Sequence, residues 1–231
     1  MKVVRGHWQM LVITAAILLL WFTPVIIPLK ILIVFFHELS HALAAWMTGG
    51  SVDSIRISPQ QGGVTVTRGG NVFLQMSAGY LGSLLIGVLL FLGAVRSHAD
   101  RIMMAGLGAV MLLIAALYIR DGFALAFIVG GGVLMLVAAR FLSRDVNDLV
   151  LRVVGLTSMI YVPMDIFSDT IARSELRSDA YMLADRFGGA TMMWGGLWLV
   201  ISLVVIGLCL RYGLGRHSNI TRSNFPETPA T

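Results

Sequence analysis

The chain has 231 residues, of which 57% are hydrophobic and 13% are charged, and its mean hydropathy is +0.85. This composition excludes an ordinary soluble domain and predicts an all-α polytopic membrane protein. The formal net charge of +5 comes from basic residues scattered singly along the chain, a pattern that favours contact with anionic lipid over nucleic acid. The single cysteine, Cys209, can form no internal disulfide and excludes a metal cluster built on cysteines.

Seven apolar runs are long enough to cross a bilayer as helices. They comprise residues 9–27, 31–48, 72–95, 102–119, 123–139, 149–165 and 191–210. The first run has no small-residue cleavage site and leads directly into the second, so we expect no cleavable signal peptide. Glycines in the third run, Gly79, Gly82 and Gly87, are expected to let neighbouring helices approach closely. The sequence therefore predicts one polytopic domain over residues 1–215, with six to seven transmembrane helices.

Residues 51–70 are too polar for a membrane span. Apolar side chains alternate in part, first at Ile55 and Ile57 and again at Val64 and Val66. The segment between these pairs contains a proline and two glycines, which is typical of the turn in a β-hairpin. We therefore expect a short hairpin loop directly after the second apolar run.

Two further segments are not predicted to cross the membrane. Residues 169–187 mix charged and apolar side chains before a pair of glycines, which predicts an interfacial helix. Residues 216–231 are polar and contain two prolines, which predicts a disordered tail.

The second apolar run contains the sequence His37-Glu38-Leu39-Ser40-His41. Side chains four apart share a face of a helix, so His37 and His41 can bind one zinc ion. Glu38 lies beside that face, where it can take a proton from water. The chain has only three glutamates, so this spacing rarely arises by chance. Ionisable residues at membrane depth are costly and usually functional, although a polar patch that packs helices together is the structural alternative.

A catalytic zinc site generally has three protein ligands and one open position. Asp165 ends the sixth apolar run just after a proline, and we expect it to be the third ligand. Asp169 shares its face one turn later and is the alternative ligand or a support for the ligands, unless it caps the polar helix that follows. The other candidates are expected at solvated positions: His7, His98, His217, Asp148, Asp179 and Asp185.

Three motifs resemble those of the site-2 protease family of intramembrane zinc metalloproteases. Residues 37–41 match its HExxH motif, residues 78–84 (AGYLGSL) look like its small-residue motif, and residues 162–165 (VPMD) look like a degenerate form of its late aspartate motif. Ile166 stands where the family has a glycine, and the usual asparagine is absent. The resemblance covers residues 31–169 and is closest to small, mostly bacterial members without a PDZ domain, the M50B-like peptidases.

The resemblance implies a zinc endopeptidase, with Zn²⁺ as its cofactor, in the plasma membrane of a bacterial cell. Its substrates would be membrane-anchored proteins or peptides rather than nucleic acid. Glu38 would be the catalytic base for the zinc-activated water. The hairpin, through Gly62, Gly63 and Val64, would present an extended substrate strand to the site.

Two other functions stay open. A zinc-binding or zinc-transport protein would use the same ligands without proteolysis, but polar residues would then line a path through several spans. The runs over residues 102–119 and 123–139 are almost wholly apolar, which argues against transport. A non-proteolytic scaffold for client helices would have no use for the intact Glu38.

Membrane topology gives a further expectation. Seven spans counted from a cytoplasmic N-terminus bring His41 and Asp165 to the same, cytoplasmic side. Lysines and arginines are equally numerous on the two sides, so the positive-inside rule does not decide the orientation. The cytoplasmic N-terminus is therefore expected from the resemblance alone.

Overall fold

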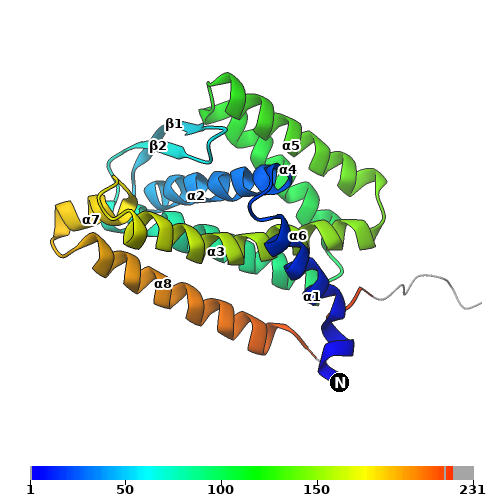
Figure 1. The fold of residues 1–231 in the computed structure, drawn as a ribbon. Helices are drawn as coiled ribbons and strands as arrows, with labels where there is room; N and C mark the ends of the chain where they lie inside the picture. Colours follow the sequence, from blue (N-terminus) through cyan, green and yellow to red (C-terminus); the bar gives the residue numbers. More distant parts are fainter. Residues whose placement is uncertain (1, 216, 221–231) are drawn as a thin grey trace, which may run out of the picture.

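The computed structural model describes residues 2–215 and 217–220 (Figure 1). Its α-helices are α1 (Lys2–Leu20), α2 (Ile27–Met47), α3 (Val72–Arg96), α4 (Asp100–Tyr118), α5 (Gly122–Phe141), α6 (Arg144–Ile166), the short α7 (Asp179–Phe187) and α8 (Thr191–Leu208). Shorter turns are the 3₁₀ turn η1 (Pro24–Ile26) and the π-helical turns η2 (Phe167–Ala172) and η3 (Cys209–Gly213). One antiparallel hairpin pairs β1 (Ser51–Ile57) with β2 (Gly63–Arg68). The predicted helical membrane fold with a short hairpin after the HExxH helix is confirmed.

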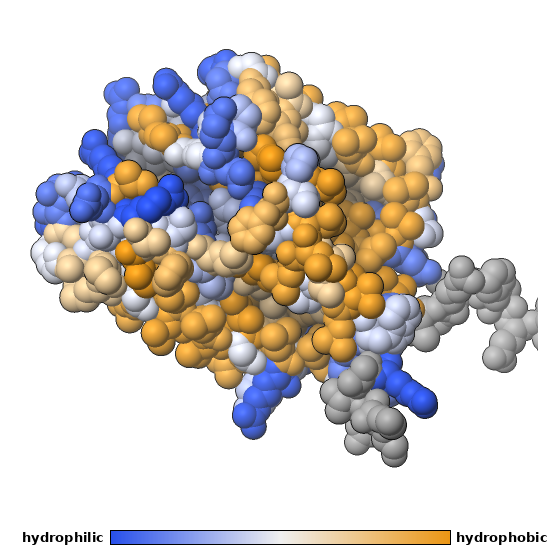
Figure 2. Space-filling model, in the orientation of Figure 1, coloured by the Kyte–Doolittle hydropathy of each residue, from blue (hydrophilic) through white to orange (hydrophobic). Residues whose placement is uncertain are grey.

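Among the described residues, six helical segments are long and apolar enough to cross a membrane. They are Pro24–Met47, Val72–Arg96, Asp100–Tyr118, Gly122–Phe141, Arg144–Ala172 and Thr191–Gly213. Hydrophobic side chains cover the flank of the molecule over the long helices, whereas hydrophilic side chains gather at the end that carries the hairpin and α7 (Figure 2). The hairpin and α7 therefore form a polar end at one side of the membrane.

The first apolar run differs from its prediction. Its apolar helix, Arg5–Leu20, is shorter than the six spans. It ends at Leu20 rather than at the predicted Ile27, because Pro24 forces Thr23 into an extended conformation and starts a new turn. α1 is thus an additional apolar helix and not a seventh span of full length.

The two ends of the described chain lie together. The backbone N–H of Ser218 donates to the carbonyl oxygen of Gly6 at 2.9 Å, and the Ser218 hydroxyl lies 2.7 Å from Nδ1 of His7. Ends on the same side of a membrane require an even number of crossings, so six spans fit and seven do not. The polar end then faces the side opposite to both ends of the described chain. A cytoplasmic N-terminus and a metal site near the cytoplasmic side, both expected above, therefore exclude each other.

α3 lies in the middle of the bundle, packed against α2 and α6. Its glycines set how closely these helices approach. A Cβ on Gly82 would lie 2.6 Å from Cβ of Ser40 on α2, and a Cβ on Gly87 would lie 2.3 Å from Cβ of Ser158 on α6. Real side chains do not pack this closely, so the prediction that these glycines allow close approach is confirmed.

The two strands of the hairpin have opposite burial patterns. β1 buries its apolar side chains Val52, Ile55 and Ile57. β2 exposes its valines, Val64 and Val66, and turns inward Gly63, Thr65 and Thr67. A strand that served only to cover the helices would turn its valines inward. The inner face of β2 is therefore arranged for polar contacts.

The predicted interfacial helix over residues 169–187 is two elements. α6 continues through Pro163 to Ile166, and the wider turn η2 follows before the chain reverses into α7. α7 packs on α3 and α8. Of the tail predicted over residues 216–231, only residues 217–220 are described, and the remainder lies outside the described residues.

Candidate metal centre

A cavity of about 540 Å³ opens at the polar end of the molecule. α2, β2, α3, the end of α6 and the start of α7 all contribute to its wall. The ionisable or hydroxyl-bearing side chains that line it include His37, Glu38, His41, Thr65, Tyr80, Asp165, Asp169, Arg177 and Asp179. Such a gathering of polar groups, in a chain with only 13% charged residues, identifies the cavity as the candidate functional site.

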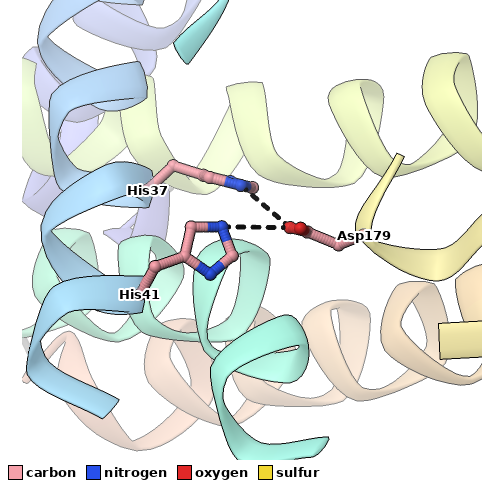
Figure 3. Close-up of side chains that lie close together, drawn as sticks. All are labelled: His37, His41 and Asp179. Atoms are coloured by element: carbon pink, nitrogen blue, oxygen red, sulfur yellow. Dashed lines mark hydrogen bonds and ion pairs between the residues drawn. The ribbon is translucent and has the colours of Figure 1, made fainter. Parts of the chain in front are cut away.

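Three of these side chains point toward one another (Figure 3). Nε2 of His37 lies 3.0 Å from Oδ2 of Asp179, and Nε2 of His41 lies 3.2 Å from the same oxygen. One ligand atom from each residue lies within 4.8 Å of the other two, so the three residues could hold one metal ion. The histidines come from adjacent turns of α2, and the carboxylate comes from the first turn of α7.

α3 fixes the orientation of both imidazoles. Nδ1 of His41 donates to the backbone oxygen of Gln75 at 2.7 Å, which leaves the lone pair of Nε2 available to a metal. Gly79 lies one turn later on α3. A Cβ there would fall 2.4 Å from Nε2 of His37 and 2.7 Å from Cε1 of His41. The absence of a side chain at Gly79 therefore makes the room in which the two rings converge.

Glu38 is only 4% exposed although it carries a carboxyl group. Its Oε2 accepts a hydrogen bond of 2.7 Å from the hydroxyl of Thr65 on β2. The first residue of the same strand, Gly63, approaches even more closely, since a Cβ there would fall 2.3 Å from Oε1. β2 thus lies directly on the Glu38 carboxyl group, beside the two histidines.

Asp179 reaches the histidines because of how α7 begins. Ser178 caps the helix by accepting a hydrogen bond from the backbone N–H of Tyr181, and a carboxylate is favoured in the first turn. Ala180 and Leu183 are fully buried, which turns this side of α7 toward the protein. Burial by itself would raise the pKa of Asp179, but the imidazoles of His41 and His37 hold the pKa well below its usual range. The carboxylate is therefore ionised at neutral pH.

The two aspartates named by the sequence lie in the cavity wall. Asp165 lines the cavity but does not belong to the group of three that could hold a metal. Asp169 accepts a hydrogen bond of 3.3 Å from the Tyr80 hydroxyl and pairs with Arg173. It therefore does not cap a following helix, because the turn at residues 167–172 continues from α6 instead of starting anew.

The expectation that Asp179 is solvated is wrong, since the residue is only 8% exposed. Asp179 lies 14 residues after Asp165 in a polar segment. It is therefore not at the end of an apolar run, which is the position that made Asp165 a candidate. One signal was present in the sequence. Ser178 is a good N-cap, and Leu183 lies four residues after Asp179, so the carboxylate shares the apolar face of the helix.

Of the other residues expected at solvated positions, His98, Asp185 and His217 are exposed. Asp148 is buried instead, because it forms an ion pair of 2.6 Å with Arg152, four residues later on α6. His7 is partly buried against Ser218. Neither Asp148 nor His7 lies in the cavity wall.

Comparison with known proteins places this site in a peptidase family. The chain matches the family described as Peptidase M50B-like over residues 10–209, a range that includes every residue of the cavity wall. No curated protein and no solved structure matches the chain. Because the family match covers most of the chain, the resemblance inferred from the three sequence motifs is confirmed, and the chain belongs to the Peptidase M50B-like family.

Proposed function

We propose that the chain is an intramembrane zinc metalloprotease that hydrolyses peptide bonds of membrane-anchored proteins. The observation that carries this proposal is the convergence of His37, His41 and Asp179 beside the carboxyl group of Glu38. Three protein ligands with an open fourth position are what a catalytic zinc site requires, and a neighbouring glutamate supplies the base. Membership of a peptidase family supports the same reaction class.

The donor atoms fit zinc. Imidazole nitrogen and carboxylate oxygen bind zinc with bonds of about 2.0–2.2 Å, which places the ligand atoms of a tetrahedral site about 3.3–3.5 Å apart. The two nitrogens lie 3.0 and 3.2 Å from the Asp179 oxygen. A small outward shift of these side chains would therefore suit the ion.

We propose Asp179 as the third ligand in place of the Asp165 expected from the sequence. Asp179 contacts both imidazoles, whereas Asp165 pairs with neither of them among the ion pairs of the described residues. Asp165 remains a second carboxyl group in the wall of the same cavity.

The chain's own residues supply the base and the geometry of the reaction. When bound, zinc would activate water and polarise the scissile carbonyl. Glu38 accepts the proton of the attacking water and then donates it to the leaving amine. Its burial shields the carboxyl group from bulk water, and the contact of His41 with Gln75 keeps that imidazole in the orientation for metal binding.

The hairpin supports a role in binding the substrate. Gly62, Gly63 and Val64 line the cavity, and β2 pairs only with β1 in the part of the chain that the structure describes. A free strand edge can pair with an extended peptide segment. We propose that the substrate unwinds locally and lies against this edge, so that its peptide bond reaches Glu38.

Glu38→Gln tests the proposed reaction. The variant should retain zinc, because Glu38 is not a ligand, and should cleave at least about a hundredfold more slowly, because an amide cannot accept the proton. The substrate would be a reporter in which a single membrane helix joins two tags, reconstituted with the purified protein. His37→Ala serves as the metal-free control. Cleavage by Glu38→Gln at the wild-type rate would contradict the mechanism.

A further inference from the structure

On the inner face of β2, the side chain of Thr65 contacts Glu38, and the proposed reaction assigns no role to this contact. The hydroxyl of Thr65 lies 2.7 Å from Oε2 of Glu38 and 3.0 Å from its backbone oxygen. Its neighbour on the same face, Thr67, donates instead to Oε1 of Gln75 at 2.7 Å. The two threonines therefore make comparable contacts from one strand, but only Thr65 touches the residue assigned as the base.

Of the two contacts that the Thr65 hydroxyl makes with Glu38, the one with the carboxyl group is stronger than the one with the backbone oxygen. A hydroxyl has a single proton to donate, and the carboxyl oxygen at the shorter distance is the preferred acceptor. A buried carboxylate also needs hydrogen-bond donors in place of water. Among the described residues, Thr65 is the donor that the structure provides to this carboxyl group. The bond thus restricts rotation of the Glu38 side chain.

Gly63 keeps the other oxygen of Glu38 clear. A Cβ at position 63 would fall 2.3 Å from Oε1 and 2.7 Å from the carboxyl carbon. With no side chain at position 63, nothing from that residue displaces Oε1, and both residues line the cavity. One carboxyl oxygen is therefore held by Thr65, and the other is free to accept a proton.

We propose that Thr65 is a positioning residue that holds Glu38 in the orientation for proton transfer. The inference rests on the proposed function, because it assigns Glu38 the role of base. It also explains the inverted pattern of β2, in which valines are exposed and a threonine is turned inward. The hairpin then has two tasks, since the strand that borders the substrate site also orients the base.

Thr65→Val tests this role, because valine has nearly the shape of threonine without its hydroxyl. Acetohydroxamate is the probe. It chelates zinc through two oxygens and gives its hydroxyl proton to a neighbouring base, so its affinity reports on the orientation of Glu38 without any cleavage. We expect zinc content equal to wild type and acetohydroxamate affinity about tenfold lower. On the reporter substrate, kcat should fall by a similar factor with little change in KM.

Two variants separate positioning from a general effect on the hairpin. Thr65→Ser keeps the hydroxyl and should restore affinity to within about threefold of wild type. Thr67→Val removes the matched bond to Gln75 and should lower acetohydroxamate affinity less than Thr65→Val does. Wild-type affinity in Thr65→Val, an equal loss in Thr67→Val, loss of zinc in Thr65→Val, or no recovery in Thr65→Ser would each overturn the inference. If the wild-type protein bound no zinc, the proposed function would fail first, and the inference with it.

Discussion

The three residues that meet in the cavity are held there by neighbours that take no part in the chemistry. The Gln75 backbone oxygen orients His41, and Gly79 provides the space for both rings. Ser178 starts the helix that carries Asp179. These contacts fix the imidazoles and the carboxylate before any ion binds, which lowers the cost of assembling the site.

Gly79→Ala should weaken zinc binding by at least about tenfold, the range seen when groups that support metal ligands are changed. The reason is steric, because the new methyl group would fall 2.4 Å from Nε2 of His37. Zinc affinity measured by competition with a chelator checks the prediction. Gly106→Ala on α4 is the matched control, since a Cβ there meets nothing within 4 Å. Equal affinities in the two variants would show that α3 does not shape the site.

At the scale of elements, the hairpin and α7 both contribute to the wall of the site. At the opposite end of the molecule, the two ends of the described chain are joined by hydrogen bonds. α1 departs from helical geometry at His7, where φ is −133°, and the backbone oxygen of Gly6 accepts a bond from Ser218. Gln9 exchanges two hydrogen bonds with the backbone of Ile220, at 2.6 and 3.4 Å. Arg152 on α6 also donates a hydrogen bond to the backbone oxygen of Ser218. Residues 217–220 therefore tie α1 to the bundle.

Gln9→Ala should lower the melting temperature by about 2–4 °C, because it removes hydrogen bonds worth about 1 kcal/mol in a chain of this size. Thermal unfolding in detergent micelles is the measurement. Gln60→Ala is the control, since Gln60 is exposed at the turn of the hairpin. A shift no larger than that of the control would mean that the contact with Ile220 does not hold α1.

Sequence patterns predict most elements of this fold, for physical reasons. Apolar runs long enough for a bilayer form α2, α3, α4, α5, α6 and α8, and partial alternation predicts the hairpin. The first run fails as a span because Pro24 divides it from α2, a break that hydropathy alone does not register. Asp179 is missed because its place depends on a chain reversal after η2, and the distance between α2 and α7 is a tertiary property.

At the scale of the whole molecule, the six crossings of the described chain place the candidate site and the two described ends on opposite sides of the membrane. The hairpin and α7 should be on one side, and the loop between α3 and α4 should be on the other with residues 217–220. A water-facing polar end would give the proposed hydrolytic site access to water, which the hydrocarbon core would deny it. If the proposed function holds, the orientation of the chain decides in which compartment a substrate would be cut.

Single cysteines can test this arrangement in a Cys209→Ala background. Cysteines at Gln60 in the hairpin and at Glu175 before α7 should react with a membrane-impermeant maleimide from one side of sealed vesicles. A cysteine at His98, between α3 and α4, should react only from the other side. All three positions are exposed, so access depends on the side of the membrane alone. Labelling of Gln60→Cys and His98→Cys from a common side would contradict six crossings.

The central claim is that His37, His41 and Asp179 together hold zinc, and metal analysis of matched variants tests it most directly. After dialysis against a weak chelator, the wild-type protein should retain about one zinc ion per chain, as expected for a site with three protein ligands. Asp179→Asn should lose most of the zinc because it replaces a charged ligand, whereas Asp165→Asn should retain it. Full zinc in Asp179→Asn, or loss of zinc in Asp165→Asn alone, would contradict the account.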